Sequence, residues 1–443
     1  MFPMKSSYWQ NWSGSVKFNP QHIFTPTSIE EVVAIVKKAN IENKKIRVVG
    51  SRHSFTPLIS TTDFLVSLDQ LQGVISIDIE KQIAEVWAGT KLERLGQELY
   101  ESGFAQENLG DINVQSIAGA LLTGTHGTGV QHGILATQIE ELTVVLPNGE
   151  VLVCSKIKNI DLYKAIGVSL GLLGIVVKMK IRIKPATTYR YESKKIQTVD
   201  LYHRIEEMKN ENEHFEFYMF PYSKNIQVKL MNETRTKNYS FKFEKWKVAT
   251  IENKAFWFLS EISRNIPKTS RMISRLSAKS VPNSRMIGPS FQLFSTVRNV
   301  KFNEMEYSIP KVHMVDATKE IQEEIIKNKF NVHFPIECRF VKADHFMISP
   351  ASARDSAYIA IHMYKGMPHQ DYFYRIEEIL QSYGGRPHWG KMHNMTLVQL
   401  EKLYPHLSQF LEIRSKLDQK NVFVNAYLGK LFNIGSCIND RRF

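Results

Sequence analysis

The sequence predicts an α+β protein of two domains. Its 443 residues exceed what one ordinary core holds, and a content of 43% hydrophobic and 11% aromatic residues is typical of a globular chain. From about residue 189 the chain becomes poorer in glycine and richer in Lys, Tyr and Phe. We therefore predict a first domain over residues 19–188, a second over residues 189–391 and a C-terminal segment over residues 392–443.

The spacing of apolar residues predicts the first half of the N-terminal domain. The expected elements are a helix at 29–43, strands at 46–49 and 64–68, a hairpin at 74–89 and a helix at 91–104. Ser28 is placed to cap the first helix, and Gly103 is placed to end the second. Helices and strands mixed in this order are what an α+β domain requires.

The second half of this domain begins with a block rich in glycine and small hydroxyl residues, 109–130. Asn148-Gly149 between two apolar runs then predicts a tight hairpin over 140–155. A helical stretch from residue 161 passes through several glycines into a strand expected at 175–183, which Pro185 ends.

Basic residues are concentrated in one segment of the second domain. The formal net charge is +13, and residues 229–285 hold thirteen lysines and arginines against four glutamates. A surface for nucleic acid or anionic lipid is one interpretation, but no nucleic-acid motif accompanies the charge. We favour a helical, solvated insertion with a basic face, or steering of an anionic cofactor, over peripheral membrane contact, although 254–276 mixes aromatic and basic residues.

Cysteine usage and hydropathy favour a cytoplasmic protein. Cys154, Cys338 and Cys437 lie far apart with no CxxC pair, so neither a disulfide framework nor a metal knot is expected. The N-terminus has no long apolar run after a basic start, and no stretch of about 18 apolar residues predicts a membrane span.

Three glycine-bearing places in the first domain point to a cofactor. Gly50, the run 124–129 and the run 167–174 each let main-chain amides face a ligand, and clustered amides attract phosphate. Together they predict a large phosphate-bearing cofactor lying across several loops. His53 follows Gly50, and as a lone histidine it is open to four roles: a loop hydrogen bond, acid or base, metal ligand, or covalent attachment. A metal is not expected, because no carboxylate or second histidine stands at ligand spacing.

Three strings of the first domain carry a resemblance to a known family: GSRHSF, SIAGALLTGTHGTG and SLGLLG. Together they resemble the flavin-binding domain of the vanillyl-alcohol oxidase superfamily. Within that superfamily they resemble the sugar-1,4-lactone oxidase and alditol oxidase group. The likeness covers about residues 19–188 and resumes near the C-terminus. It implies an FAD-binding domain of the PCMH type, built from two α+β subdomains. It also implies an antiparallel-sheet substrate domain that covers the isoalloxazine, and a C-terminal segment that returns to the FAD domain.

The resemblance implies FAD bound covalently through His53, from an imidazole nitrogen to the flavin 8α carbon. The other residues that it implies at the cofactor are Gly50, Ser51, Arg52, Ser54, Ser116, Gly119, Thr123, Gly124, Thr125, His126, Gly127, Gly129, Gly174, Ile175, Val176 and Lys391. Asn425 and Tyr427, in the closing segment, are expected to serve mainly in packing.

The resemblance implies four catalytic residues: Glu337, Arg339, Lys391 and Ser116. Glu337 and Arg339 lie two apart, so on a strand they face the same side, and spacing alone predicts an ion pair. Likewise, spacing alone predicts a packed turn around Trp389 in the stretch 384-GGRPHWGKMH-393. The resemblance instead implies that Glu337 binds the hydroxyl being oxidised, while Arg339 and Lys391 place positive charge at the reduced flavin or the substrate.

The implied reaction is oxidation of an alcohol group of a sugar-1,4-lactone, such as D-arabinono- or L-gulono-1,4-lactone. Hydride passes to flavin N5, and O₂ reoxidises the flavin to give H₂O₂. An alditol oxidase acting on xylitol or sorbitol is the alternative, and a non-catalytic flavin-binding protein is the second alternative. Gln115, beside Ser116, leaves open whether oxygen or another acceptor is used.

Overall fold

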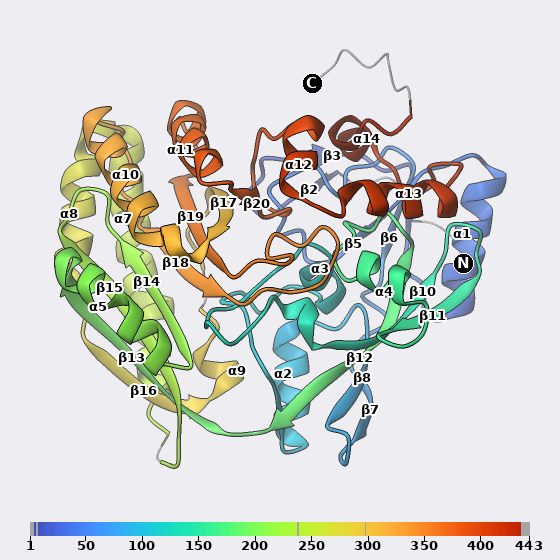
Figure 1. The fold of residues 1–443 in the computed structure, drawn as a ribbon, viewed down its shortest axis with the longest axis horizontal. Helices are drawn as coiled ribbons and strands as arrows, with labels where there is room; N and C mark the ends of the chain where they lie inside the picture. Colours follow the sequence, from blue (N-terminus) through green and yellow to red (C-terminus); the bar gives the residue numbers. More distant parts are fainter. Residues whose placement is uncertain (1–3, 6–7, 237–238, 297, 436–443) are drawn as a thin grey trace.

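The computed structural model describes residues 4–5, 8–236, 239–296 and 298–435, and it confirms the α+β class. Figure 1 shows the large sheet of the second domain beside the N-terminal domain, with the last helices of the chain lying over the latter. The bounds of the predicted domains stay a prediction, whereas the elements within them are described below.

The N-terminal subdomain contains a four-stranded sheet in the order β1-β4-β6-β5. Its elements are β1 (Met4–Lys5), β4 (His22–Phe24), α1 (Ile29–Ile41), β5 (Ile46–Val49) and β6 (Phe64–Ser67), beside a small ribbon of β2 (Trp9–Gln10) and β3 (Lys17–Phe18). Ser28 caps α1 as predicted, since its hydroxyl accepts from the Glu31 N–H. The helix ends two residues before the predicted limit. Strand β5 pairs in parallel with β6, so the loop after Val49 leaves at the carboxyl edge of the sheet.

The second subdomain is an antiparallel sheet in the order β11-β10-β12-β8-β7, with β9 paired to the end of β12. Its strands are β7 (Val74–Asp78), β8 (Ile83–Trp87), β9 (Phe104–Gln106), β10 (Ile139–Val145), β11 (Val151–Ser155) and β12 (Ile175–Pro185). Its helices are α2 (Leu92–Glu101), α3 (Ile117–Leu122), the short 3₁₀ turn Leu135–Gln138 and α4 (Ile160–Ile166). Both predicted hairpins form. Strand β12 runs two residues beyond the predicted Ile183, because Pro185 still pairs with Phe104.

The second domain is built on an eight-stranded antiparallel sheet in the order β16-β13-β15-β14-β18-β19-β17-β20. Its strands are β13 (Thr188–Gln197), β14 (His214–Met219), β15 (Asn225–Thr234), β16 (Ser284–Pro289), β17 (Phe302–Pro310), β18 (Ile336–Val341), β19 (Ser356–Tyr364) and β20 (Arg386–Pro387). Its main helices are α5 (Thr198–Glu211), α6 (Lys242–Lys247), α7 (Asn253–Asn265), α8 (Ser270–Ser280), α9 (Ser290–Leu293), α10 (Met314–Lys327) and α11 (Gln370–Ser382).

The C-terminal segment packs back on the first domain through α12 (Leu397–Leu403), α13 (Leu407–Leu417) and α14 (Ala426–Phe432). The Ile46 N–H donates to the Val422 carbonyl at 2.7 Å, which adds a main-chain contact to β5. The buried Arg47 guanidinium donates to the Phe423 carbonyl at 2.6 Å. Asn425 caps α14 and also donates to the Pro57 carbonyl at 2.8 Å, so the closing segment holds both ends of the loop that carries His53.

Among the described residues, no helix combines the length and the apolar character needed to cross a bilayer. Cys154 and Cys338 are buried free thiols, and Cys437 lies outside the described residues.

Candidate active site

Two cavities meet at His53. The inner cavity lies within the first domain and is lined by the loop 47–54, by residues around 115–123 and by the run 170–176. The outer cavity, of about 480 Å³, lies between the first domain and the large sheet. His53, Ser54, Gln115 and Thr123 line both, so one elongated ligand can occupy the two together.

The loop that carries His53 is tightly constrained. A Cβ placed on Gly50 would lie 2.1 Å from the Ser116 hydroxyl oxygen and 3.2 Å from the Ser116 Cβ, so a side chain here would displace Ser116 at the start of α3. Arg52 takes a left-handed backbone conformation with φ of 62°. The Phe55 N–H donates to the Gly390 carbonyl at 2.7 Å, which fixes the loop against the turn that carries Lys391.

His53 is held as a neutral imidazole. Burial and the neighbouring Lys391 ammonium lower the pKa of His53 to about 4. Its ring lies 5.7 Å from the Trp12 ring at an angle of 24°. At neutral pH a ring nitrogen therefore keeps its lone pair, which a nucleophilic or covalent role requires.

The wall of the outer cavity formed by the large sheet carries a network of opposite charges. Asp111, Glu304, Glu337, Arg298, Arg339 and Lys391 line the cavity, and Glu216 and Lys229 lie behind Arg339 and complete the network. Arg339 lies between two carboxylates: it donates to Glu216 at 2.7 Å and is paired with Glu337. Each of these four carboxylates is paired with at least one of the cations, so these buried charges are compensated.

The cations keep the carboxylates of this network ionised. Burial alone would raise the pKa of Glu337, but Arg339 and Arg298 lower it to about 2. Burial likewise opposes ionisation of Glu304, yet the Lys391 ammonium, 2.5 Å away, and His362 hold the pKa of that carboxyl well below its usual range. Glu337 also accepts a hydrogen bond from the Tyr218 hydroxyl at 2.8 Å. These groups are therefore fixed acceptors and donors rather than groups that titrate near neutral pH.

The structure separates the predicted site residues into three groups. Those lining the inner cavity are Gly50, Ser51, Arg52, His53, Ser54, Ser116, Gly119, Thr123, Gly174, Ile175 and Val176. Those lining the outer cavity are Thr125, His126, Glu337, Arg339 and Lys391, together with His53, Ser54 and Thr123. Gly124, Gly127 and Gly129 line neither cavity. A Cβ on Gly127 would lie 2.3 Å from the Leu109 carbonyl oxygen, so close backbone packing accounts for this glycine.

Sequence reasoning missed several charged residues of the outer cavity. Glu304 and Glu306 lie two residues apart on β17, so both face the same side of the sheet, and both are buried. Charged residues at every second position of an otherwise apolar strand could have predicted this buried polar face. The Glu306 carboxylate lies 3.0 Å from the His126 ring, and both side chains are buried. Arg298 pairs with Asp111 across the two domains, and no sequence spacing relates these two residues.

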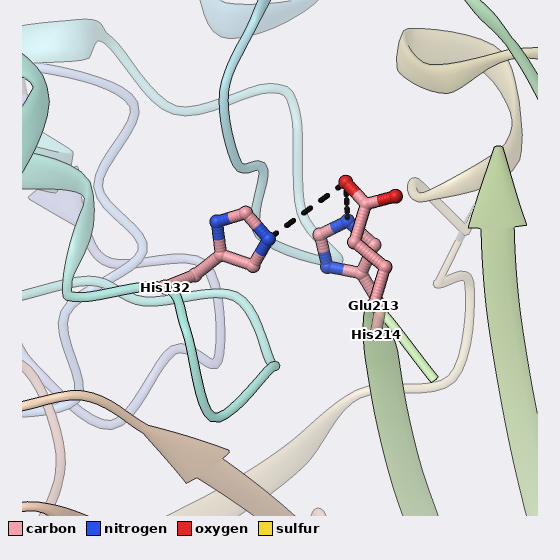
Figure 2. A group of neighbouring side chains, drawn as sticks. All are labelled: His132, Glu213 and His214. Carbon is pink, nitrogen blue, oxygen red and sulfur yellow. Dashed lines mark ion pairs between the residues drawn. The ribbon is translucent and has the colours of Figure 1, made fainter. Parts of the chain in front are cut away.

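A second polar cluster joins the domains away from these cavities. Figure 2 shows His132, Glu213 and His214, with both marked ion pairs ending on one Glu213 oxygen, at 3.8 Å and 3.3 Å from the two imidazoles. The same oxygen accepts from the Tyr189 hydroxyl at 2.6 Å and lies 3.3 Å from the Lys184 ammonium. Because these groups already compensate the carboxylate, we interpret the cluster as an interdomain ion-pair network rather than a metal centre.

The two cavities fit FAD. The inner one offers main-chain amides and the Ser54 hydroxyl to a pyrophosphate, whereas the Ser51 and Thr123 hydroxyls donate to main-chain carbonyls. The outer one offers room for a planar ring system beside the charge network. The buried Thr125 hydroxyl, in the wall of the outer cavity, has no hydrogen-bond partner among the described residues. A buried hydroxyl without a hydrogen-bond partner destabilises the folded protein, and a polar ligand in the outer cavity would supply that partner.

Comparison with known proteins assigns the family. Residues 179–431 match the family described as D-arabinono-1,4-lactone oxidase, and residues 20–155 match the family described as FAD binding domain. L-gulono-1,4-lactone dehydrogenase from Mycobacterium tuberculosis is 34% identical over 95% of this chain and 98% of its own length. The chain belongs to the D-arabinono-1,4-lactone oxidase family.

Other relatives agree with this family assignment. L-gulonolactone oxidase from Mus musculus is 32% identical over 97% of this chain and 99% of its own length. The crystal structure of cholesterol oxidase from Brevibacterium sterolicum has a TM-score of 0.82 with 18% identity, covers 96% of this chain and 97% of its own, and shows the shared fold alone. This D-arabinono-1,4-lactone oxidase family member is thus an FAD-dependent oxidoreductase acting on CH–OH groups, as the sequence predicted.

Proposed function

We propose that this chain oxidises an alcohol group of a sugar-1,4-lactone, of the D-arabinono- or L-gulono-1,4-lactone type, with O₂ as acceptor. The observation that carries the proposal is the outer cavity: it is lined by paired charges from both domains and lies next to His53. Its hydrogen-bonding groups suit a small ring with several hydroxyls. The two sequence relatives described above are both named as lactone enzymes, which supports the same substrate class.

When bound, FAD would supply the acceptor for the hydride that the carbinol carbon loses as its hydroxyl loses a proton, which leaves a carbonyl compound, and the two electrons with two protons would then convert O₂ to H₂O₂. The residues of the chain orient the substrate and stabilise the negative charge that develops on the cofactor. We assign Glu337 to accept the hydrogen bond of the reacting hydroxyl and Arg339 to orient that hydroxyl. Because the pKa of Glu337 lies near 2, this carboxylate remains an acceptor throughout the working pH range.

Lys391 is assigned to stabilise negative charge at the pyrimidine edge of the cofactor. Its ammonium lies 2.5 Å from Glu304 and 5.3 Å from the centre of the Phe55 ring, so it is held beside the His53 loop. A positive charge fixed in advance lowers the cost of forming an anion there. Ser116 lines the inner cavity, and we propose that its hydroxyl contacts the cofactor rather than the substrate.

We propose covalent attachment of FAD through His53, supported by the neutral imidazole at the junction of the cavities. The remaining predicted cofactor residues that line either cavity are proposed to contact FAD directly. Gly124, Gly127 and Gly129 are proposed to shape the loop that carries Thr125 and His126. Two buried free thiols, Cys154 and Cys338, support a reducing cytoplasm as the proposed location.

The test compares candidate substrates under anaerobic conditions. Purified holoprotein is mixed with D-arabinono-1,4-lactone, L-gulono-1,4-lactone, xylitol or sorbitol, and bleaching of the flavin absorbance is followed in a stopped-flow instrument. We expect rapid bleaching by a lactone and slow bleaching by polyols. A large advantage for polyols indicates an alditol oxidase instead, and no bleaching by any of them indicates a non-catalytic flavin protein. Oxygen consumption and H₂O₂ formation then test the acceptor.

A further inference from the structure

The insertion between β15 and β16 exposes an unusual number of large apolar side chains. Of twenty-two such residues exposed in the described chain, nine lie between residues 239 and 276: Tyr239, Phe243, Trp246, Ile251, Trp257, Phe258, Ile266, Met272 and Leu276. Every exposed phenylalanine and tryptophan among the described residues belongs to this group. A solvated basic insertion, which the sequence favoured, would instead have turned its aromatic rings inward.

The aromatic residues form one stripe along a continuous helical segment. Helix α6 runs through the π-helical turn Val248–Glu252 directly into α7. Phe243 and Trp246 are three apart, with ring centres separated by 6.0 Å, and Ile251, Lys254 and Phe258 follow at intervals of three and four. The interval of five between Trp246 and Ile251 spans the π turn, whose wider winding keeps both halves of the stripe on one face.

The opposite face of this segment is anchored to the protein. Phe256 packs edge-to-face on Phe334 with ring centres 4.8 Å apart. Ser260 is fully buried, and its hydroxyl lies 2.9 Å from the His333 ring nitrogen. The segment is therefore held in place by its inner face, while Phe243, Trp246 and Phe258 remain 68%, 55% and 60% exposed.

The positive charge of this insertion indicates which kind of partner binds the exposed face of α6 and α7. Between residues 239 and 285 the chain carries ten lysines and arginines against three glutamates. Lys242, Lys254 and Lys268 form no ion pair with any described residue. A second copy of the chain would bring the same positive charge to the contact, whereas an anionic surface with an apolar layer beneath it matches both the cations and the rings.

We propose that the stripe on α6 and α7 docks this protein on a membrane surface that contains anionic phospholipids. The aromatic rings enter the boundary between headgroups and acyl chains, and the flanking lysines contact lipid phosphates. The segment is proposed to lie in the plane of the interface, because its inner face is packed along the protein through Phe256 and Ser260.

Vesicle sedimentation tests the proposal with the purified holoprotein. We expect the protein to pellet with vesicles of mixed phosphatidylcholine and phosphatidylglycerol at low salt, and to remain in the supernatant with pure phosphatidylcholine or at high salt. The triple variant Phe243→Ser, Trp246→Ser, Phe258→Ser should lower the partition coefficient about ten-fold or more, because three buried rings are lost from the interface. Lactone oxidation in solution should be unchanged, which shows that the variant folds.

A matched control removes three exposed apolar side chains elsewhere, Ile157→Ser, Tyr374→Ser and Val398→Ser, and should bind vesicles like the wild type. Equal binding by wild type and the stripe variant overturns the proposal, as does failure of the wild type to bind anionic vesicles. Light scattering provides the third outcome: a wild-type dimer that becomes a monomer in the stripe variant would show that a second copy covers this face.

Discussion

The N–H of Phe55 donates to the carbonyl oxygen of Gly390 at 2.7 Å, and this bond joins loops that are more than three hundred residues apart in sequence. The Thr56 hydroxyl adds a second link, to the Trp389 carbonyl at 3.2 Å. His53 and Lys391 each lie within two residues of the first bond. The proposed attachment point and the proposed cation are thus positioned by one rigid unit, so substitutions in either loop are expected to affect both roles.

Replacing His53 with alanine should release the flavin from the polypeptide. The wild-type protein, denatured in acid and separated from small molecules, is expected to keep flavin fluorescence, whereas His53→Ala should keep none. Noncovalent binding in the inner cavity should survive, since the other lining residues are unchanged. His203→Ala, on the exposed surface of α5, is the control and should retain the fluorescence. A wild type that loses all its flavin on denaturation contradicts covalent attachment.

Replacing Lys391 with methionine should slow flavin reduction by about 100-fold, because a charge fixed next to the forming anion is removed. Glu304 then loses its nearest cation and takes up a proton more easily. Stopped-flow reduction with the preferred lactone measures the rate, and Lys391→Arg should recover part of it. Lys402→Met, on the exposed side of α12, is the control. An effect on KM alone, with the reduction rate intact, would assign Lys391 to substrate binding.

A side chain at residue 50 should disrupt the contact between β5 and α3. Gly50→Ala places a methyl group 2.1 Å from the Ser116 oxygen, so we expect a loss of about 1–3 kcal/mol in the free energy of unfolding and reduced flavin content. Adding Ser116→Gly removes the clash and should restore most of the melting temperature. Gly110→Ala, where the nearest atom would lie 3.4 Å away, should be tolerated. Failure of the double variant to recover stability would show that the loss has another cause.

Asp344 should make the protein more stable when it is protonated. Burial raises the pKa of Asp344 from its ordinary 3.8 to about 6. Between these values the folded state binds more protons than the unfolded state, so stability falls as pH rises and reaches its lower level above about pH 6. The total cost of ionisation is about 2–3 kcal/mol at pH 8.

Asp344→Asn should therefore raise the melting temperature by several degrees at pH 8 and by less at pH 5, because the neutral amide carries no such cost. The asparagine oxygen can still accept from the Phe346 N–H, which lies 2.9 Å from the Asp344 carboxylate. Asp355→Asn is the control: its carboxylate is 40% exposed and its pKa is lowered by hydrogen bonds from Lys311 and Ala343, so no gain is expected. An equal change at both pH values would exclude titration of Asp344 as the cause.

Local sequence signals were sufficient for most elements of the first domain and for a phosphate-bearing cofactor, whereas FAD itself was implied by the family resemblance. The Ser28 cap, the alternation over 74–89 and Asn148-Gly149 each act within a few residues, so each was predicted from its own stretch of chain. Glu337 and Arg339 were predicted as a same-face pair, and they are in contact on β18.

Contacts between distant segments could not be predicted in this way. The pairing of Arg298 with Asp111, and that of Lys391 with Glu304, depends on how two domains meet, and no periodicity encodes that geometry. The outward direction of Phe243 and Trp246 was missed for a related reason. Aromatic residues usually face a core, and only the packing of Phe256 on the opposite side decides which face is buried.

The return of the closing segment also fixes the order of events in the cell. Val422, Phe423 and Asn425 hold β5 and the loop after His53, yet they follow that loop by more than three hundred residues in the sequence. While these residues are still in the exit tunnel, the loop lacks the contacts that shape it. Loading of the cofactor therefore follows the synthesis of residues 422–425, and a chain truncated before residue 422 should be colourless.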